Sequence, residues 1–322
     1  MNTILKKNCN LKVIAFWLFF YCTSLSIYSS AYASLYAVLL DDALPLYKRV
    51  ITGITIESQV DFTEFSLEGD TAKANDIMKQ IVALSPQIII AIGPKSANTA
   101  KKYAAKIPVI YCLVPKLEDY ELELPNVFGI RLEFSYEKQL QALQTLFPKV
   151  KKIGVLYNPT QSKSTVEQAT IAAQKIGIHL VGIEISLPSE AKKALDELKN
   201  PIDALWMISD PTALHLKAWD ASQQFCIAHK LPFFALDDGF VARGALISFA
   251  VDYVWVGRQA ARLANRIVFE NFSPKNPKIM EPEGLDMAIN ITTATQLGIA
   301  PELSVNLLNY AAYHQHAIQA LR

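Results

Sequence analysis

One sequence unit occurs twice in this chain: an apolar strand that runs into a short polar turn and then a helix. The first copy spans residues 87–96 and the second spans residues 152–160. Units of this kind build parallel sheets, because a parallel connection needs a long crossover segment such as a helix. Each copy lies in its own half of a 322-residue chain, a length that usually divides into two domains. The repeat therefore predicts an α/β protein of two Rossmann-like lobes with a ligand cleft between them.

The same alternation of strand and helix continues through both halves. In the first half we predict strands over 35–40, 61–67, 87–92 and 108–114, and helices over 47–58, 71–84 and 96–105. In the second half we predict helices over 136–146, 164–176, 189–198, 213–229 and 254–269, and strands over 152–157, 180–185, 204–208, 232–236 and 286–291. Continuously apolar strands are typical of parallel sheets covered by helices on both faces. We therefore expect each lobe to contain one such sheet.

The chain contains no low-complexity linker, so we expect ordered segments to cross between the lobes, the first near residues 127–134. We assign residues 34–130 to an N-terminal lobe, to which about 250–285 return. We assign 131–249 to a C-terminal lobe, together with about 286–300. Residues 301–322 are predicted to be a helical tail.

The N-terminal 33 residues have the pattern of a secretory signal peptide. Lys6, Lys7 and Lys12 supply the positive charge, an apolar run follows over 13–25, and Ala31-Tyr32-Ala33 fits the cleavage rule. A retained membrane anchor is the alternative, but the apolar run is shorter than the roughly 20 residues of a spanning helix. We therefore expect cleavage before Ser34 and a periplasmic location.

Cys22 raises the alternative of a lipoprotein. The residues before it, Phe20 and Tyr21, are bulky where a lipidation site needs small side chains, so we disfavour this alternative. Cleavage would leave Cys112 and Cys226, which could pair in an oxidising compartment. We favour two buried free thiols.

The charge of the processed chain argues against a nucleic-acid partner. Removing residues 1–33 removes three lysines from 31 basic residues and none of the 30 acidic residues, which leaves a net charge of −2. Nucleic-acid-binding domains usually carry a clustered basic surface. We therefore expect no nucleic acid among the partners.

The sequence contains no recognisable catalytic or cofactor motif. It has no GxxxxGK[ST] loop, no GxGxxG, no HExxH and no GxSxG. His314 and His316 point apart on a helix, so they do not form a metal site. Asp237 and Asp238 resemble a catalytic pair, but neighbours at a strand end face opposite ways. We therefore predict no catalytic residue, no metal and no cofactor, and rank an exported hydrolase or isomerase third among the functions.

Candidate ligand contacts follow from the topology, because parallel α/β sheets bind ligands beyond the carboxyl ends of their strands, at helix N-termini. The turns at these ends supply most of the candidates, and Arg131 lies near the predicted crossing. The candidates are Asp41, Ser96, Pro115, Arg131, Tyr157, Asn158, Ser164, Asp210 and Asp237. Free N–H groups at the helix starts would attract an anion, Arg131 would clamp a carboxylate, and Asp210 or Asp237 would take an ammonium group.

Each candidate also has a purely structural interpretation. Ser96 and Ser164 suit helix caps, and Ser164 forms a capping box with Glu167 three residues later. Asp41 and Asp210 suit turn formers. Tyr111 suits either an aromatic wall of the site or the core, and Arg131 suits a solvated surface position.

The order and spacing of several segments resemble the ABC transporter substrate-binding protein family that includes tryptophan- and tyrosine-binding lipoproteins. The resemblance covers residues 35–299. Matching segments include IIAIG at 89–93, IPVIY at 107–111, KIGVLYNP at 152–159, DALW at 203–206, LPFF at 231–234 and VGRQAA at 256–261. The resemblance implies a type I periplasmic-binding-protein fold, a monomer that closes on a small-molecule ligand, and delivery to an ABC permease in the inner membrane.

The resemblance also implies where the ligand lies. Ser96, Asn158, Asp210 and Asp237 fall at its cleft positions, whereas Arg258 falls on a helix that packs against the sheet. Lys95, Lys116 and Arg131 depart from the family pattern by adding cations to the cleft. An amino acid is the ligand favoured by precedent, and an acidic or phosphorylated ligand suits the added cations equally well. A receptor subunit for a membrane kinase or chemoreceptor is the second functional alternative.

Overall fold

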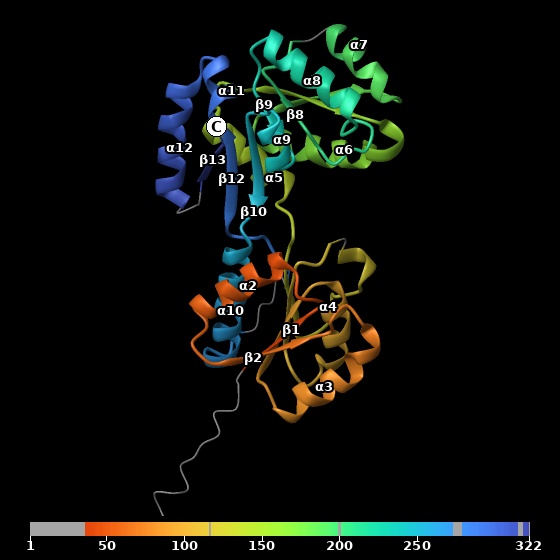
Figure 1. Cartoon of the computed structure of the whole chain (residues 1–322), viewed down its shortest axis with the longest axis vertical. Helices are drawn as coiled ribbons and strands as arrows, with labels where there is room; N and C mark the ends of the chain where they lie inside the picture. The colour runs from red at the N-terminus through yellow and green to blue at the C-terminus, as the bar shows by residue number, and fades with distance from the viewer. Residues whose placement is uncertain (1–35, 116, 199–200, 273–278, 315–317, 322) are drawn as a thin grey trace, which may run out of the picture.

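The structure, a computed structural model, describes residues 36–115, 117–198, 201–272, 279–314 and 318–321. Two separate sheets, each covered by helices, form two lobes along the long axis of the molecule (Figure 1). We call the lobe that contains β1 lobe 1 and the lobe that contains β6 lobe 2. The predicted signal peptide, its cleavage site after Ala33, and Lys116 lie outside the described residues.

Lobe 1 is built on a six-stranded sheet in which every neighbouring pair is parallel. Its order is β11-β5-β4-β3-β1-β2. The strands are β1 (Tyr36–Leu40), β2 (Phe62–Ser66), β3 (Ile88–Ile92), β4 (Val109–Cys112), β5 (Val127–Ile130) and β11 (Ile279–Met280). The helices are α2 (Pro45–Glu57), α3 (Ala74–Ala83), α4 (Pro94–Ala100) and α10 (Tyr253–Phe269), with single 3-10 turns at Thr71–Lys73, Lys101–Tyr103 and Leu117–Asp119.

Lobe 2 repeats this plan with seven strands in the order β13-β12-β10-β9-β8-β6-β7. The strands are β6 (Lys152–Tyr157), β7 (His179–Glu184), β8 (Ala204–Trp206), β9 (Phe233–Ala235), β10 (Ile247–Val251), β12 (Leu285–Asn290) and β13 (Ile318–Leu321). The helices are α5 (Tyr136–Leu146), α6 (Pro159–Lys175), α7 (Ala191–Asp196), α8 (Leu216–Ala228), α9 (Asp238–Ala242), α11 (Ile291–Gln296) and α12 (Ala300–His314), with a 3-10 turn at Pro188–Glu190. β10 and β12 form an antiparallel pair within this otherwise parallel sheet.

The predicted fold class, two α/β lobes with parallel sheets covered by helices, is confirmed. All five residues of β1 and of β3 are buried, because helices cover both faces of the sheet. Alternate residues of β1 belong to different cores: Val38 packs with one cluster, and Leu39 packs with another on the opposite face. In both lobes the first strand lies between the second and the third, which creates a topological switch point beside it.

The close packing of α10 on α2 completes lobe 1, although α10 follows β10 of lobe 2 in the sequence (Figure 1). Gly53 and Gly257 lie where the two helices cross. A Cβ at Gly53 would stand 1.9 Å from the carbonyl oxygen of Val254, and one at Gly257 would stand 1.9 Å from that of Val50. Only glycine permits this approach of backbone to backbone. Arg258, predicted to be structural, pairs with Glu57 of α2 at 2.8 Å.

Several predicted elements differ from the structure. The strands β5, β10 and β11 were not predicted; β5 and β11 are short, and all three lie next to the segments that cross between the lobes. The helix expected from Ser164 begins at Pro159, where Asn158 caps it. The tail expected to be helical to its end contains α12 and then the short strand β13, which pairs with β12.

Two further observations concern membrane-spanning helices and the cysteine thiols. Within the part of the chain that the structure describes, no helix has the length and apolar character needed to cross a membrane. Cys112 and Cys226 are buried free thiols, one in each lobe, which is the favoured of the two predictions made for them.

Candidate functional site

The crossings between the lobes show how the two sheets are oriented. The chain leaves the end of β5 at Ile130 and enters α5 of lobe 2 at Tyr136. It leaves the end of β10 at Val251 and enters α10 of lobe 1 at Tyr253. In lobe 1, β5 is parallel to its neighbour β4, and in lobe 2, β10 is parallel to its neighbour β9. The edges at which the parallel strands end, here called the carboxyl edges, therefore face each other across the space between the lobes.

At the switch point of lobe 1, a buried carboxylate joins two neighbouring strands. Asp41 follows β1 and is 6% exposed. Its carboxylate accepts hydrogen bonds from the backbone N–H groups of Lys95, at 3.0 Å, and Ser96, at 2.5 Å, in the first turn of α4 after β3. A carboxylate is stabilised at this positive end of a helix. The N–H groups that were expected to attract a ligand anion are therefore already bonded to the protein's own aspartate.

Gly93, between β3 and α4, makes this arrangement possible. Its φ angle is +103°, and a Cβ there would lie 2.5 Å from Cγ of Asp41 and 2.7 Å from the hydroxyl oxygen of Tyr47. Burial, together with the charge of Asp41, raises the pKa of Tyr47 to about 12, so this hydroxyl stays neutral. Glycine is therefore required for both the backbone conformation and the space.

Ser96 lies in the first turn of α4 and is fully buried. It is not the helix cap that we predicted, because α4 begins two residues earlier, at Pro94, and Gly93 occupies the cap position. Its Oγ has no hydrogen-bond partner within the described residues. Buried polar atoms in native proteins are nearly always paired, so an unpaired one needs an explanation.

At the switch point of lobe 2, the polar groups pair with one another. Asp210 is fully buried; one carboxylate oxygen accepts from the backbone N–H of Asn158 at 2.9 Å. The other oxygen accepts from the N–H groups of Thr212 and Ala213, each at 2.9 Å. The side-chain amide of Asn158 donates to Oγ1 of Thr212 at 3.0 Å, and Gln161 donates to the same oxygen at 3.2 Å. We call Asn158, Gln161, Asp210 and Thr212 the lobe 2 network.

The remaining predicted contacts are not gathered at one place. Tyr157 is buried and donates to Glu184 at 3.0 Å; burial, with this hydrogen bond, raises the pKa of Tyr157 to about 12. Asp237 is exposed and caps α9 by accepting from the N–H of Phe240 at 3.2 Å. Pro115 and Ser164 are exposed. The predicted capping box of Ser164 with Glu167 is wrong, because α6 begins at Pro159 under a cap from Asn158; the helix kinks at Ser162, two residues before Ser164.

A cavity of about 340 Å³ lies in lobe 1, beside β4, β5 and β11. The residues that line it are Tyr111, Leu117, Glu121, Leu122, Glu123, Arg131 and Ile279. Tyr111 is fully buried, and its hydroxyl is the second buried polar atom without a partner in the described part of the chain. Its ring fills the space over Gly129, where a Cβ would stand 2.0 Å from the ring. Of the predicted ligand contacts, only Arg131 lines this cavity.

Two charged groups lie close enough to Tyr111 to affect the pKa of its hydroxyl. Burial raises its pKa to about 12; the guanidinium of Arg131 partly opposes this shift and the carboxylate of Glu123 adds to it. Arg131 forms a long ion pair of 3.8 Å with Glu281, and both side chains are about half exposed. Glu121 and Glu123 form no ion pair with any described residue. Sequence reasoning missed these two carboxylates as candidate site residues. Their only signal in the sequence is that two acids flank Leu122.

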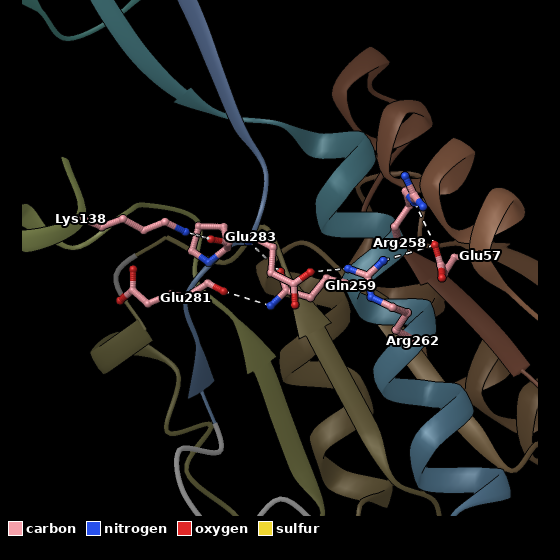
Figure 2. Close-up of polar contacts among 8 residues, drawn as sticks. Glu57, Lys138, Arg258, Gln259, Arg262, Glu281 and Glu283 are labelled. Atoms are coloured by element: carbon pink, nitrogen blue, oxygen red, sulfur yellow. Dashed lines mark hydrogen bonds and ion pairs between the residues drawn. The ribbon is translucent and has the colours of Figure 1, made fainter. Parts of the chain in front are cut away.

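The segment from Glu281 to Glu283 crosses from β11 to β12 and contacts both lobes (Figure 2). From α10 of lobe 1, Gln259 bonds the backbone at Glu281 and at Glu283, at 3.0 and 3.1 Å, and Arg262 pairs with the side chain of Glu283. From α5 of lobe 2, Lys138 donates to the carbonyl of Pro282. The carboxylate of Glu281 also accepts from the N–H of Ser135, just before α5, at 2.9 Å. The segment is therefore held by both lobes at the place where they join.

A second link between the lobes involves Arg49 of α2. Its guanidinium lies 3.4 Å from Asp252, before α10, and 3.5 Å from Asp286 of β12. Burial, together with the charge of Asp252, raises the pKa of Asp286, and Arg49 opposes that shift. Arg49 thus offsets the repulsion between two carboxylates at the base of lobe 2.

Comparisons with known proteins agree with this architecture. The model of a family described as "ABC transporter substrate binding protein" matches residues 51–315. A tyrosine-binding protein of Clostridioides difficile (strain R20291) is 28% identical over 270 residues, which cover 81% of this chain and 76% of that protein. The ligand-free, open structure of a substrate-binding protein with adhesive properties from Clostridium difficile has a TM-score of 0.64 at 22% identity. The similarity covers 83% of this chain and 95% of that one.

Proposed function

The chain belongs to the ABC transporter substrate-binding protein family, whose members are non-enzymatic components of transporters, and from this premise we propose that it captures a small amino acid-type ligand between its lobes. The ligand would then be delivered to an ABC permease in the inner membrane. The proposed ligand class follows from the tyrosine-binding relative and from the cationic and acidic groups that line the lobe 1 cavity.

The observation that carries the proposal is that the carboxyl edges of two parallel sheets face each other. Sheets of this type bind ligands at such edges, beside their switch points. A ligand that contacts both edges favours the closed arrangement of the lobes by its higher affinity for that arrangement. Closure of the lobes would change the backbone dihedral angles mainly in the segments that cross between them.

The predicted site residues divide into two groups under this proposal. Arg131 is the proposed anchor of the ligand carboxylate, because its long ion pair with Glu281 leaves donors to spare. Ser96 stays a predicted contact: its hydroxyl has no partner in the described residues, but it is fully buried, so a ligand would have to displace its neighbours to reach it. Asp41, Asn158 and Asp210 support the walls of the site through bonds within the protein.

Titration with amino acids tests the proposal. A thermal-shift screen of the purified chain would include L-tyrosine, L-tryptophan, acidic amino acids, phosphorylated compounds and small carboxylates. A ligand that binds only the folded state stabilises it by about 2.7 kcal/mol at 100 times its Kd, so an amino acid should raise the Tm. The proposal fails if no amino acid shifts the Tm and the denatured protein releases no small molecule by mass spectrometry.

Export to the periplasm is a separate part of the proposal, supported by the N-terminal pattern of charge and apolar residues. Mass spectrometry of the protein from its native host should find a chain that starts at Ser34. An intact N-terminus, or a lipid attached to Cys22, would contradict the proposed processing.

A further inference from the structure

Three charged residues meet where the two lobes join, and we call them the interlobe cluster: Arg49, Asp252 and Asp286. Arg49 lies on α2 of lobe 1, Asp286 lies on β12 of lobe 2, and Asp252 lies in the crossing from β10 to α10. The guanidinium of Arg49 is 3.4 Å from the carboxylate of Asp252 and 3.5 Å from that of Asp286. A cation of lobe 1 therefore reaches a carboxylate of lobe 2.

Asp252 is attached to lobe 1, although it follows a strand of lobe 2. Its carboxylate caps α10 by accepting from the N–H of Val254 at 2.9 Å. The next residue, Tyr253, begins α10, and its ring centre lies 5.6 Å from the guanidinium of Arg49. Because α10 packs closely on α2, Asp252 and Arg49 are held by one pair of helices. Of the two ion pairs in the cluster, only that of Arg49 with Asp286 joins the lobes.

The two carboxylates of the cluster lie on the same face of the β10–β12 pair. Asp286 is opposite Ala250 in the antiparallel register, and Asp252 is two residues beyond Ala250, so the two aspartates are diagonal neighbours. The backbone N–H of Asp252 also bonds the carbonyl of Gly284 at 3.1 Å, which keeps the two segments adjacent. Like charges this close repel each other, and Arg49 offsets the repulsion because it pairs with both.

The surroundings of Asp286 contain charges of both signs. Burial, followed by the charge of Asp252, raises the pKa of Asp286; Arg49 opposes this shift, and Asp238 at the start of α9 adds to it. Loss of Arg49 would therefore leave Asp286 facing two carboxylates. The side chain of Arg49 is 47% exposed, so water and salt weaken its ion pairs and the expected effects are modest.

From this geometry we infer that Arg49 controls the relative arrangement of the lobes: its pairing with Asp286 across the joint stabilises the arrangement seen in this structure. A rotation of one lobe against the other would change the distance from Arg49 to Asp286, whereas the distance from Arg49 to Asp252 would stay nearly constant. Without Arg49, the two carboxylates would repel each other across the joint. Arrangements that separate Asp286 from Asp252 would then become more populated.

The consequence for ligand binding rests on the proposed function, in which a ligand favours the closed arrangement of the lobes. The apparent Kd of such a ligand depends on how much of the free protein is in the arrangement that binds it. The interlobe cluster would therefore tune affinity without touching the ligand. Its effect on the arrangement of the free lobes does not depend on any ligand.

A distance measurement between two spin labels, one on each lobe, tests the inference. The labels would be attached at Asn98→Cys in α4 and Lys163→Cys in α6, two exposed positions on helices that begin at the facing carboxyl edges. The two cysteines within the described residues are buried, and Cys9 and Cys22 would be replaced by serine, so that the labels attach at the chosen positions.

Two variants and a control would be compared with the unaltered labelled chain. Arg49→Met keeps the aliphatic part of the side chain and removes the charge, and Arg49→Met/Asp286→Asn also removes the repulsion that is left. The control is Lys192→Met, which removes an exposed ion pair with Asp196 inside one helix of lobe 2. The Tm of each variant checks that it folds, and Arg49→Gln replaces Arg49→Met if that variant does not fold.

One interlobe distance should dominate in the unaltered chain. Arg49→Met should lower the ratio of that population to the others by about 2- to 5-fold, the effect of one ion pair near the surface. Arg49→Met/Asp286→Asn should recover part of this loss, because a neutral asparagine is not repelled by Asp252. Lys192→Met should leave the distribution of distances unchanged.

Each result decides for or against the inference. A change in Arg49→Met that the double variant partly reverses, with no change in the control, supports it. An unchanged distribution in Arg49→Met overturns it, and so does a change that persists in full in the double variant, since the effect would then not act through Asp286. Because no ligand is present, overturning the inference leaves the proposed function standing, and a chain that binds no amino acid can still show the effect of Arg49.

Discussion

The carboxyl edges of the two lobes have the same topology but opposite polar chemistry. In lobe 2, Asn158, Asp210 and Thr212 bond one another, and each oxygen of Asp210 has a partner. In lobe 1, Asp41 makes a similar bridge, but Ser96 and Tyr111 keep buried hydroxyls without partners. The difference is that the buried polar groups of lobe 2 are satisfied within the protein, whereas two buried hydroxyls of lobe 1 are not.

The largest effect is expected from Asp210→Ala, which would break the lobe 2 network. Three backbone N–H groups, those of Asn158, Thr212 and Ala213, would lose their acceptor inside a fully buried site. Each unsatisfied group costs about 1–3 kcal/mol, so the free energy of unfolding should fall by about 3 kcal/mol or more, measured by chemical denaturation. Asp196→Ala, which removes an exposed ion pair with Lys192, is the control and should change it by less than about 1 kcal/mol. A loss for Asp210→Ala as small as that of the control would show that the network does not stabilise lobe 2.

A change in ligand affinity is expected from Arg131→Ala, which removes the proposed carboxylate anchor of lobe 1. Binding of L-tyrosine should weaken by about 1.5–3 kcal/mol, the range for hydrogen bonds to charged groups. Binding of tyramine, which lacks the carboxylate, should change much less. The matched control is Arg243→Ala in lobe 2, an exposed arginine that lies over the ring of Phe240. Equal losses for tyrosine and tyramine would refute the anchoring role, because they would place the effect of Arg131 elsewhere.

A smaller loss of stability is expected from Asp41→Ala, the lobe 1 counterpart of the first prediction. Two N–H groups in the first turn of α4 would lose their acceptor, compared with three in lobe 2. Removal of a helix-capping acceptor costs about 0.5–2 kcal/mol, so the free energy of unfolding should fall less than for Asp210→Ala. Denaturation of both variants under one set of conditions gives the ranking. A larger loss for Asp41→Ala than for Asp210→Ala would contradict the view that the polar groups of lobe 2 are the more fully hydrogen-bonded.

The smallest effects come from removing one hydroxyl in each lobe. Ser96→Ala removes an unpaired oxygen, so the Tm of the ligand-free protein should stay the same or rise. Thr212→Val removes the acceptor used by Asn158 and Gln161, so it should lower the free energy of unfolding by about 1 kcal/mol. Similar losses of unfolding free energy for the two variants would mean that the Ser96 hydroxyl does have a hydrogen-bond partner in the folded protein.

Much of the fold could be predicted because the strongest signals are local. The apolar runs of β1 and β3 are buried along their whole length, and their composition alone indicates a covered parallel sheet. The start of α6 was misplaced, although Asn158 followed by Pro159 is itself a typical helix start. The capping box at Ser164 and Glu167 was a competing pattern of the same kind; α6 begins at the earlier signal and kinks at Ser162, just before the later one.

The site was harder to predict, because its bonds join residues that are distant in the sequence. Asp41 bonds α4 across more than fifty residues, and Asp210 bonds Asn158 across a similar interval. Nothing local to either aspartate distinguishes a ligand contact from a bridge to the neighbouring turn. The one sequence signal of Glu121 and Glu123, two acids on either side of a leucine, gave no reason to place them with Tyr111 and Arg131 around one cavity. The sequence therefore located the edge of each sheet but not the roles of the groups along it.

The glycine crossing of α2 and α10 has a consequence for biosynthesis. Lobe 1 begins with the first described residue, yet the helix that seals it ends at Phe269. The N-terminal half therefore cannot reach its native core while it leaves the ribosome; it must wait until nearly the entire polypeptide has been made. Contacts so distant in sequence form slowly, because a long loop must close first. The first strands of lobe 1 thus lack their covering helix until late in synthesis, and export before that point would thread a segment that has not completed its fold.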